Sequence, residues 1–409
     1  MTSPIQLYKK AYSGLSRNSW YLSLVVLINR SGTMVLPFMT IYCTQALHFT
    51  IVQAGIIMGL FGLGSITGAF IGGKITDKYG FYDVQVCSLL SAGLLFILLG
   101  YQTNFFAICG CVYILSMCND AFRPANSTAI AAYSTPENKT RSYSLNRLAV
   151  NLGWSFGGAL GGFLAAHNYH LLFWVDGCTN LMSGLLLLKI MPRSNYKKPA
   201  NDTHPDAKTS PYKDSIYMIF ILLTTLFGMC FFQTFTIQPV FYKTIWHIDE
   251  RVIGSLMALN GLMVAFIEMV LINWLEGKRH ALRYICLGVL LTGISLTFMN
   301  LLPPAVWVAT MVIIVISFGE MFAMPFMNSF WIVRTNDNNR GQYAALYTMA
   351  WSAAQILAPV IGSQIIALFG YGALWWSLAC VCLAAAIGFL LLYKLRFQNQ
   401  LITIKSEVE

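Results

Sequence analysis

The chain has 409 residues, of which 57% are hydrophobic and only 10% are charged. A soluble globular domain carries about 25% charged residues, so this composition excludes a chain that covers itself with a water-facing surface. The formal net charge of +10 comes from basic residues spread along the chain rather than gathered in one patch, which argues against a nucleic-acid-binding protein. A membrane-spanning helix needs about 20 mostly apolar residues, so the length accommodates about twelve spans.

Apolar runs of spanning length follow one another along the chain and predict an all-α integral membrane protein. The one long polar stretch, 193–214, contains lysines and prolines and is typical of a flexible cytoplasmic linker. It divides the chain into an N-terminal six-helix bundle (1–192) and a C-terminal six-helix bundle (215–409). The twelve predicted spans are 20–45, 52–73, 84–101, 105–132, 142–166, 170–190, 215–241, 252–275, 282–300, 305–333, 342–368 and 371–395.

The distribution of lysine and arginine predicts the orientation of these spans. Predicted loops on one side carry almost all of the basic residues, whereas the opposite loops carry only Lys243 and Arg251. Because cytoplasmic loops are enriched in lysine and arginine, the basic side is predicted to be cytoplasmic, with both termini on it. We therefore expect a multi-pass protein of the cell inner (plasma) membrane, without a cleaved signal peptide.

The sequence contains no recognisable metal-binding or catalytic motif. Most of the ten cysteines lie inside apolar runs, where cysteine behaves as a small hydrophobic residue. They lack histidine at metal-ligand spacing, and neither a nucleophile elbow nor a phosphate-binding loop is recognisable. We therefore expect no enzyme activity, no metal and no cofactor. The expected partners are a small-molecule substrate, protons and the lipid bilayer, for a protein that is monomeric and binds no nucleic acid.

A weak internal repeat relates the two predicted bundles. Asp120 and Glu320 are 200 residues apart, and each shortly precedes a proline, Pro124 or Pro325. A parallel repeat of this kind predicts two halves related by an axis along the membrane normal, which gives pseudo-two-fold symmetry.

Charged residues inside predicted spans are costly and mark candidate functional sites. Arg30 lies about ten residues into the first span, roughly 15 Å deep, where snorkelling to the membrane surface is not possible. We therefore expect Arg30 to face a cavity.

Two acidic residues are candidates for proton coupling. Asp120 and Arg123 are three residues apart, so they share a helix face. They form either an inert buried pair or a proton switch in which protonation of Asp120 frees Arg123. Glu320 has no basic residue within one helical turn of it in the sequence, and desolvation disfavours its charged form. It is expected either to bind a proton or to make a structural hydrogen bond.

Other polar and aromatic residues are candidates for lining a substrate cavity. Asp176 either lines an outer vestibule or caps a neighbouring helix. The candidate cavity residues are Arg30, Asn29, Asn119, Arg123, Asp176, Gln233, Gln238, Trp331, Tyr347 and Trp351.

Between the second and third predicted spans, residues 72–80 read GGKITDKYG. This segment resembles the signature G-x-x-x-D-[RK]-x-G-[RK]-[RK] of the major facilitator superfamily, although Phe81 and Tyr82 replace the trailing basic pair. The resemblance implies the major facilitator fold and a latch of the outward-facing state in which Asp77 faces the helix beginning near Gly341. The alternative is that Asp77 caps a turn. The residues assigned to this latch are Gly73, Asp77, Lys78, Gly80, Arg141 and Arg340.

Residues 153–162 read GWSFGGALGG and resemble the antiporter signature G-x-x-x-G-P-x-x-G-G of the same superfamily. Gly158 stands where that signature has proline. Small residues let helices approach closely, so helix packing alone also explains this segment. The glycines assigned to helix packing are Gly153, Gly157, Gly161 and Gly162.

Short segments at 29–32, 120–125 and 151–153 resemble the multidrug-exporter, or drug:proton antiporter, branch of the superfamily. This resemblance implies proton-coupled export of amphipathic compounds by alternating access. An alternative is proton-coupled import of a small polar metabolite or peptide, because arginine suits carboxylates and phosphates. A more remote alternative is a membrane sensor or scaffold that transports nothing.

Overall fold

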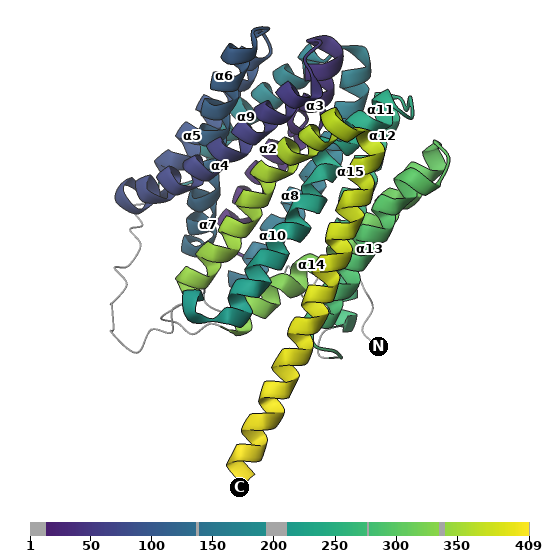
Figure 1. The fold of residues 1–409 in the computed structure, drawn as a ribbon. Coiled ribbons are helices and arrows are strands. Elements are labelled where there is room, and N and C mark those ends of the chain that lie inside the picture. The colour runs from purple at the N-terminus through teal and green to yellow at the C-terminus, as the bar shows by residue number, and fades with distance from the viewer. Residues whose placement is uncertain (1–13, 136–138, 194–210, 276–277, 335–339, 409) are drawn as a thin grey trace. The chain divides into compact units, whose positions relative to one another are not determined.

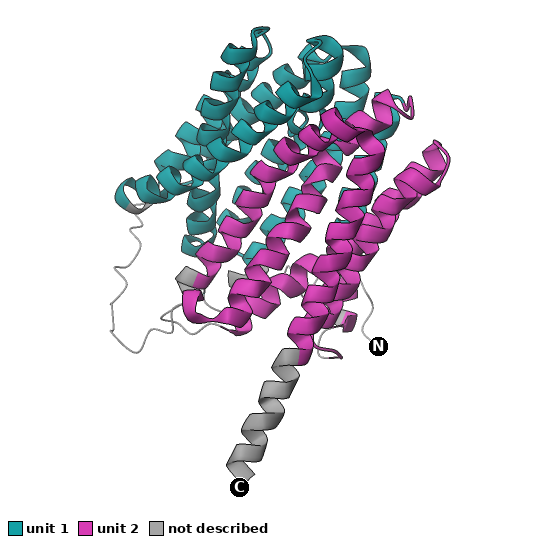
Figure 2. Cartoon of the chain, viewed as in Figure 1, with its two compact units in different colours: residues 1–200, 249–265 teal, residues 201–248, 266–409 magenta. Residues whose placement is uncertain are grey.

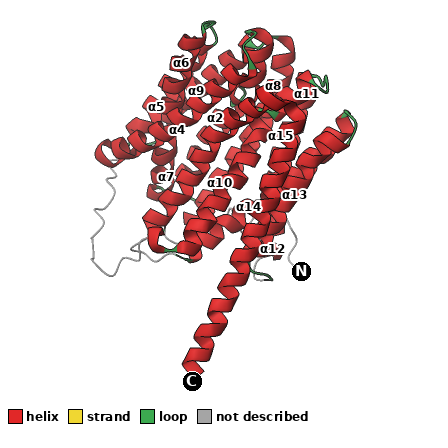
Figure 3. Ribbon diagram, viewed as in Figure 1, coloured by secondary structure: helices red, strands yellow, loops and turns green. Residues whose placement is uncertain are grey.

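The computed structural model describes residues 14–135, 139–193, 211–275, 278–334 and 340–408 (Figure 1). Within these ranges the chain is helical and contains no strand (Figure 3). It forms two compact units (Figure 2): unit 1 comprises residues 1–200 and 249–265, and unit 2 comprises residues 201–248 and 266–409.

Unit 1 contains the helices of the first half of the chain together with the first part of α12. Its helices are α2 (Arg17–Ser31), α3 (Val35–Ile41), the π-helical turn η1 (Tyr42–Ala46), α4 (Ile51–Tyr79), α5 (Phe81–Leu99), α6 (Phe105–Asp120), α7 (Phe122–Ala132), α8 (Lys139–His167), α9 (His170–Ile190) and α12 (Glu250–Leu275).

Unit 2 contains the remaining helices and the last part of α12. They are the short 3₁₀ turn η2 (Pro211–Lys213), α10 (Ser215–Thr236), α11 (Gln238–Thr244), α13 (Ala281–Leu301), α14 (Val306–Val333) and α15 (Arg340–Val408).

Eleven helical stretches among the described residues have the length and apolar character needed to cross a membrane. The last of them, Tyr343–Lys394, has 52 residues. At about 1.5 Å per residue it is more than twice as long as the hydrocarbon core of about 30 Å. The helix is interrupted at Gly370, whose φ of 82° and ψ of 173° are not helical. This stretch therefore contains the last two predicted spans, 342–368 and 371–395.

The second span is longer than predicted, because the segment 74–79 continues α4 instead of forming a loop. The backbone N–H of Gly80 still donates to the carbonyl of Thr76 at 2.9 Å, and α5 begins at the next residue, Phe81. Gly80 has φ 94° and ψ 161°, a backbone conformation that is essentially restricted to glycine. A single residue therefore makes the turn between two helices.

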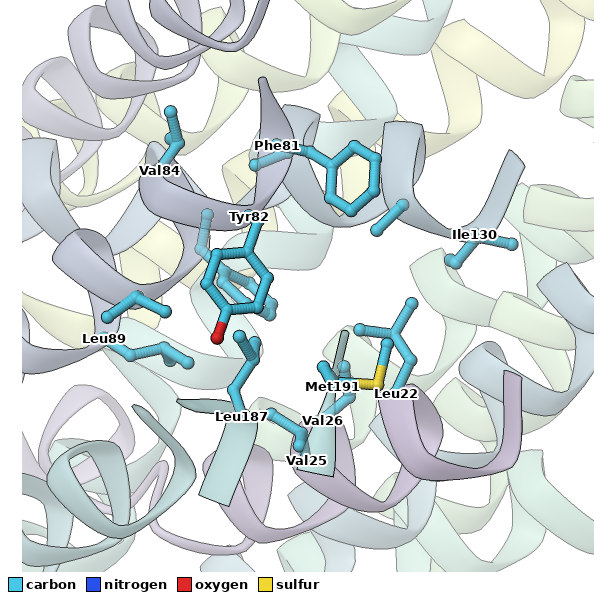
Figure 4. Close-up of a cluster of buried hydrophobic side chains, with 14 of the residues drawn as sticks. Leu22, Val25, Val26, Phe81, Tyr82, Val84, Leu89, Ile130, Leu187 and Met191 are labelled. Atoms are coloured by element: carbon cyan, nitrogen blue, oxygen red, sulfur yellow. The ribbon is translucent and has the colours of Figure 1, made fainter. Parts of the chain in front are cut away.

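The packed interior of unit 1 near this turn is apolar (Figure 4). It is built mainly from residues of α2, α5, α7 and α9, with Ala149 of α8, and the ring of Phe81 lies edge-on to Tyr133 at 5.5 Å between centroids. Burial of such side chains contributes roughly 1.5–3 kcal/mol each in water, whereas inside a bilayer close packing supplies the stability instead. The labelled residues of this cluster are Leu22, Val25, Val26, Phe81, Tyr82, Val84, Leu89, Ile130, Leu187 and Met191.

We predict that Gly80→Ala destabilises the protein by about 1–3 kcal/mol, because alanine is strained in this backbone conformation. The measurement is the thermal unfolding midpoint of the purified protein in detergent. Gly110→Ala is the matched control, since Gly110 lies inside α6 and a methyl group there meets no atom within 4 Å. Equal midpoints for the two variants would contradict the strain at Gly80.

Candidate functional site

An ion pair between a buried carboxylate and an exposed arginine lies where the helices α6 and α7 meet. The Nε of Arg123 lies 2.9 Å from Oδ1 of Asp120, and the Asp120 side chain is only 2% exposed, against 56% for Arg123. Pro124 has no N–H to donate to the carbonyl of Asp120, which weakens the helix at this turn. The helix is interrupted at Ala121. The spacing of three residues thus places the two charges together at an irregular turn.

Arg30, in the last turn of α2, belongs to the same group of charges. Its guanidinium interacts electrostatically with the charged groups of Arg123, Asp120 and Asp176. Unit 1 therefore brings together two arginines and two carboxylates from α2, α6, α7 and α9. The four formal charges balance when both carboxylates are ionised.

The first helix is interrupted beside Arg30, and Asp176 accepts hydrogen bonds from the backbone where the helix starts again. Its Oδ2 accepts hydrogen bonds from the backbone N–H groups of Met34 (3.3 Å) and Val35 (3.2 Å), at the start of α3. At Gly32, a methyl group would overlap the side chain of Thr179. A carboxylate at the start of a helix is stabilised by the unpaired N–H groups there. Asp176 is 2% exposed and so caps a neighbouring helix from inside the unit.

A chain of buried amides extends this contact to Asn29. The Nδ2 of Asn29 donates to Oδ1 of Asn180 at 2.8 Å, and Nδ2 of Asn180 donates to Oδ1 of Asp176 at 3.2 Å. Asn180 was not among the candidates from the sequence. Its position four residues after Asp176 on one helix is a signal that was available.

Glu320 and the predicted second-half residues lie in unit 2. Glu320 is half-buried on α14, next to Gly319, which packs against Gly288 and Thr292 of α13. Pro325 lies inside α14 without ending it. Asn119, in unit 1, is half-buried on α6 directly before Asp120.

The three aromatic residues singled out in the sequence lie together in unit 2. The ring centroids of Trp331 and Tyr347 are 6.0 Å apart, and those of Tyr347 and Trp351 are 6.3 Å apart. Phenylalanines of α10 surround Trp351 at 6.0–6.3 Å and complete the cluster: Phe227, Phe231 and Phe232. We call these six residues the aromatic cluster.

The two glutamine candidates are buried and engaged with neighbours. Gln233 donates through Nε2 to the carbonyl of Ala358 at 2.7 Å. Gln238 begins α11, where the first helix of unit 2 is interrupted at Ile237, and its Nε2 donates to the hydroxyl of Tyr242 at 2.6 Å. Its Oε1 is buried without a hydrogen-bond partner.

The glycines of α8 form two packing faces. Gly153, Gly157 and Gly161 face the first helix, where added methyl groups would meet Arg30, Thr33 and Met34 within about 3.2 Å or less. Gly158 and Gly162 face α12, and both lie against Gly254 or its neighbours. Backbone-to-backbone contact of this kind is typical of small residues in membrane helices.

One hydrogen bond reinforces the packing of α8 and α12. The hydroxyl of Tyr169 donates to Oε1 of Glu250, the first residue of α12, at 2.8 Å. Burial and the Glu250 carboxylate both raise the pKa of Tyr169, so its phenol stays protonated and acts as the donor.

Most of the predicted latch lies outside the described side chains. The backbone positions of Asp77, Arg141 and Arg340 are helical, but their side chains are not among those described. Lys78 is exposed, with Nζ 5.0 Å from the ring centroid of Tyr79. Gly73 lies within α4, and an added methyl group would only touch Pro124 at 3.9 Å. The latch stays a prediction.

A family profile decides the relationship of this protein. The profile of the Major Facilitator Superfamily matches residues 22–359, most of the chain. The chain belongs to this superfamily. It is thus a multi-pass integral membrane protein of a transporter family, as the sequence signature predicted.

Two relatives and one solved structure are similar to this chain over most of its length. The Na(+), Li(+), K(+)/H(+) antiporter of Planococcus maritimus is 24% identical, over 90% of this chain and 92% of its own length. The class H tetracycline resistance protein of Pasteurella multocida is 22% identical, over 87% and 88%. A crystal structure of a variant of the nucleoside transporter NupG superposes with a TM-score of 0.81 at 12% identity, over 92% of this chain and all of that one. This likeness confirms the major facilitator fold.

We predict that Asp176→Ala lowers the stability of this superfamily member by about 1.5–3 kcal/mol, because two buried backbone N–H groups lose a charged acceptor. Asp83→Ala is the control, since Asp83 forms an exposed ion pair with Arg193, and exposed pairs contribute about 0–1 kcal/mol. Thermal unfolding in detergent compares the two. A drop no larger for Asp176→Ala than for Asp83→Ala would show that the cap contributes little.

Proposed function

We propose that this protein is a proton-coupled secondary transporter that exports amphipathic small molecules by alternating access. The observation that carries the proposal is the buried carboxylate of Asp120, which pairs with the exposed guanidinium of Arg123 and lies near Arg30. An inert buried ion pair is often replaceable by apolar residues at little cost. A group of four charges inside an apolar unit therefore favours a working role.

Asp120 suits a proton switch because gain or loss of its proton changes the net charge of the group that it forms with Arg30, Arg123 and Asp176. With Asp120 ionised, the carboxylate neutralises a nearby guanidinium. With Asp120 protonated, Arg123 loses its partner and the group carries one excess positive charge. A proton gradient drives transport only if this change stabilises the two access states differently. Asp176 is assigned to positioning here, since its oxygens already accept hydrogen bonds from Met34, Val35 and Asn180.

Glu320 is proposed as the second proton-binding residue. It occupies the place in the second half that Asp120 occupies in the first, on a helix that contains a proline shortly afterwards. In transporters built from parallel repeats, coupling-ion sites lie near the bilayer midplane where the repeats meet. Glu320 would thus be the counterpart of Asp120 in the second half. The proposed moving parts are residues 1–192 and 215–409, joined by 193–214, in a monomer with cytoplasmic termini.

The aromatic cluster supports an amphipathic substrate. Aromatic faces bind both flat apolar groups and organic cations. Two similar proteins carry names that fit this direction: one is called a tetracycline resistance protein and one a cation/proton antiporter. Within unit 1, Asn119, Arg30 and Arg123 would orient the substrate. Asn29, Gln233 and Gln238 are buried and already hydrogen-bonded, so they would support the cavity wall.

Proton-coupled import of a small polar metabolite or peptide is the second candidate function. The Arg123 side chain is 56% exposed although its partner is buried, and a guanidinium binds carboxylates in a bidentate manner. A sensor or scaffold is the remote alternative. Failure to move any compound of a broad panel in proteoliposomes would favour it.

We predict that Asp120→Asn and Glu320→Gln each reduce transport driven by a pH gradient about 100-fold, because the neutral amides remove the differential effect of protonation. Exchange of labelled for unlabelled substrate without a gradient should continue. The assay uses proteoliposomes, an imposed pH gradient and a panel of lipophilic cations and small carboxylates.

Asp83→Asn is the matched control, because it removes an exposed carboxylate of the same unit. It should transport at the wild-type rate. Full gradient-driven transport by both Asp120→Asn and Glu320→Gln would end the proton-coupling proposal. Transport of carboxylates into vesicles, rather than export of cations, would favour the second candidate function.

We also predict that Trp351→Ala raises KM for an exported aromatic compound about tenfold, because each lost aromatic contact is worth about 0.5–1.5 kcal/mol. Trp307→Ala is the control, since Trp307 lies in the first turn of α14 and is 60% exposed. Concentration-dependent transport rates give KM for both. A KM for Trp351→Ala that matches the control would remove the aromatic cluster from the substrate site.

A further inference from the structure

A second ion pair, absent from the sequence candidates, lies at the end of unit 2 where the linker enters. Asp214 precedes α10 and caps it, since its Oδ1 accepts from the backbone N–H of Tyr217 at 3.1 Å. Arg334, directly after α14, donates through Nη2 to Oδ1 at 2.8 Å and to Oδ2 at 2.7 Å, and through Nε to Oδ2 at 3.1 Å. A two-nitrogen contact of this kind fixes geometry as well as charge.

A third helix joins the same carboxylate. The hydroxyl of Tyr343, in the first turn of α15, donates to Oδ2 of Asp214 at 3.1 Å. The hydroxyl of Tyr217 donates to the backbone carbonyl of Tyr343 at 2.6 Å, and the two rings are 4.4 Å apart. The side chains of Arg334 and Asp214 are only 16% and 19% exposed. One carboxylate therefore connects the start of α10, the end of α14 and the start of α15.

Unit 1 joins the corresponding helix ends through serine hydroxyl groups. Ser16 caps α2, and its hydroxyl lies 2.8 Å from the carbonyl of Tyr133, directly after α7. The hydroxyl of Ser19 lies 3.4 Å from that of Ser142, near the start of α8. Corresponding helix ends are thus joined in both units. Among the side chains that the structure describes at these ends, hydroxyl groups make the contacts in unit 1 and an ion pair makes them in unit 2. Serine hydroxyl groups are sufficient to join these helix ends in unit 1. Joining the helix ends alone therefore does not require an ion pair in unit 2.

The ion pair lies one turn from the aromatic cluster along two helices. Trp331 precedes Arg334 by three residues, and Tyr347 follows Tyr343 by four. Residues three or four apart share a helix face. The rings of Trp331 and Tyr347 are 6.0 Å apart. The separation of the ends of α14 and α15, which Asp214 sets, therefore determines how these two rings meet.

We propose that Asp214 is a positioning residue for transport, which ties α14 and α15 to the point where the linker enters unit 2 and so fixes the aromatic cluster. The effect on substrate rests on the function proposed above. The effect on the helix ends does not depend on it.

The test is hydrogen–deuterium exchange of the full-length protein carrying Asp214→Asn. Asparagine is as good a helix cap as aspartate, so this variant removes the charge pairing and keeps the cap. We expect backbone amides of residues 344–350 to exchange about tenfold faster, because the first turns of α15 open more often. Arg334→Gln should have the same effect, and the double variant should add little to either. Asp83→Asn is the control and should leave this segment unchanged.

Transport kinetics separate positioning from simple stability. In Asp214→Asn, KM for a transported aromatic compound should rise at least fivefold while the amount of folded protein is unchanged. Unchanged exchange at 344–350 would overturn the proposal, as would faster exchange confined to the first turn of α10. Faster exchange throughout unit 2 would also overturn it, because Asp214 would then only hold the fold. If no panel compound is transported but 344–350 exchanges faster, the positioning of the helix ends stands and the proposed function fails.

Discussion

The hydrogen bonds from Met34 and Val35 to the Asp176 carboxylate are the contact on which the charged group of unit 1 depends. In a membrane every backbone polar group must find a partner within the protein, so an interrupted helix needs an acceptor for the N–H groups that it frees. Because Asp176 supplies that acceptor, α2 is able to end at Ser31. Arg30 then lies in the last turn of α2, where the helix dipole favours a positive charge. The interruption thus places the half-buried Arg30 at a helix end.

The two units solve the same structural problem with different chemistry. The first helix of each is interrupted, beside Gly32 in unit 1 and at Ile237 in unit 2. In unit 1 a carboxylate caps the restarted helix, whereas in unit 2 the restarted helix has a proline in its first turn, which needs no such partner. Where the linker enters unit 2, Asp214 replaces the hydroxyl that Ser16 supplies in unit 1. The two units therefore keep contacts between the same helix ends, but the side chains that make these contacts differ in charge.

The sequence predicted what depends on local spacing and failed where partners are distant. Composition and apolar run length predicted the helical membrane fold, and a spacing of three residues predicted that Asp120 and Arg123 are neighbours. The carboxylate of Asp214 binds Arg334, which is 120 residues away, and no local pattern links the two. Capping of a neighbouring helix was one of the two predicted alternatives for Asp176, but the sequence did not identify the capped residues, because they are backbone groups of another helix. The length of α4 was missed because a single glycine, Gly80, makes a turn for which a loop was expected.

The charge balance of unit 1 connects the sign of a substrate to the direction of coupling. Arg30 and Arg123 both lie near Asp120, while Asp176 is engaged by backbone N–H groups. Protonating Asp120 therefore removes the negative charge that balances these guanidinium groups, and the excess positive charge acts on an ion bound near them. A cation bound near this group is destabilised by the proton, so that the two compete, as antiport requires. An anion is stabilised by it, so that both bind together, as symport requires. Aromatic rings prefer cations to anions, so the aromatic cluster of unit 2 supports the proposed transport of an amphipathic cation.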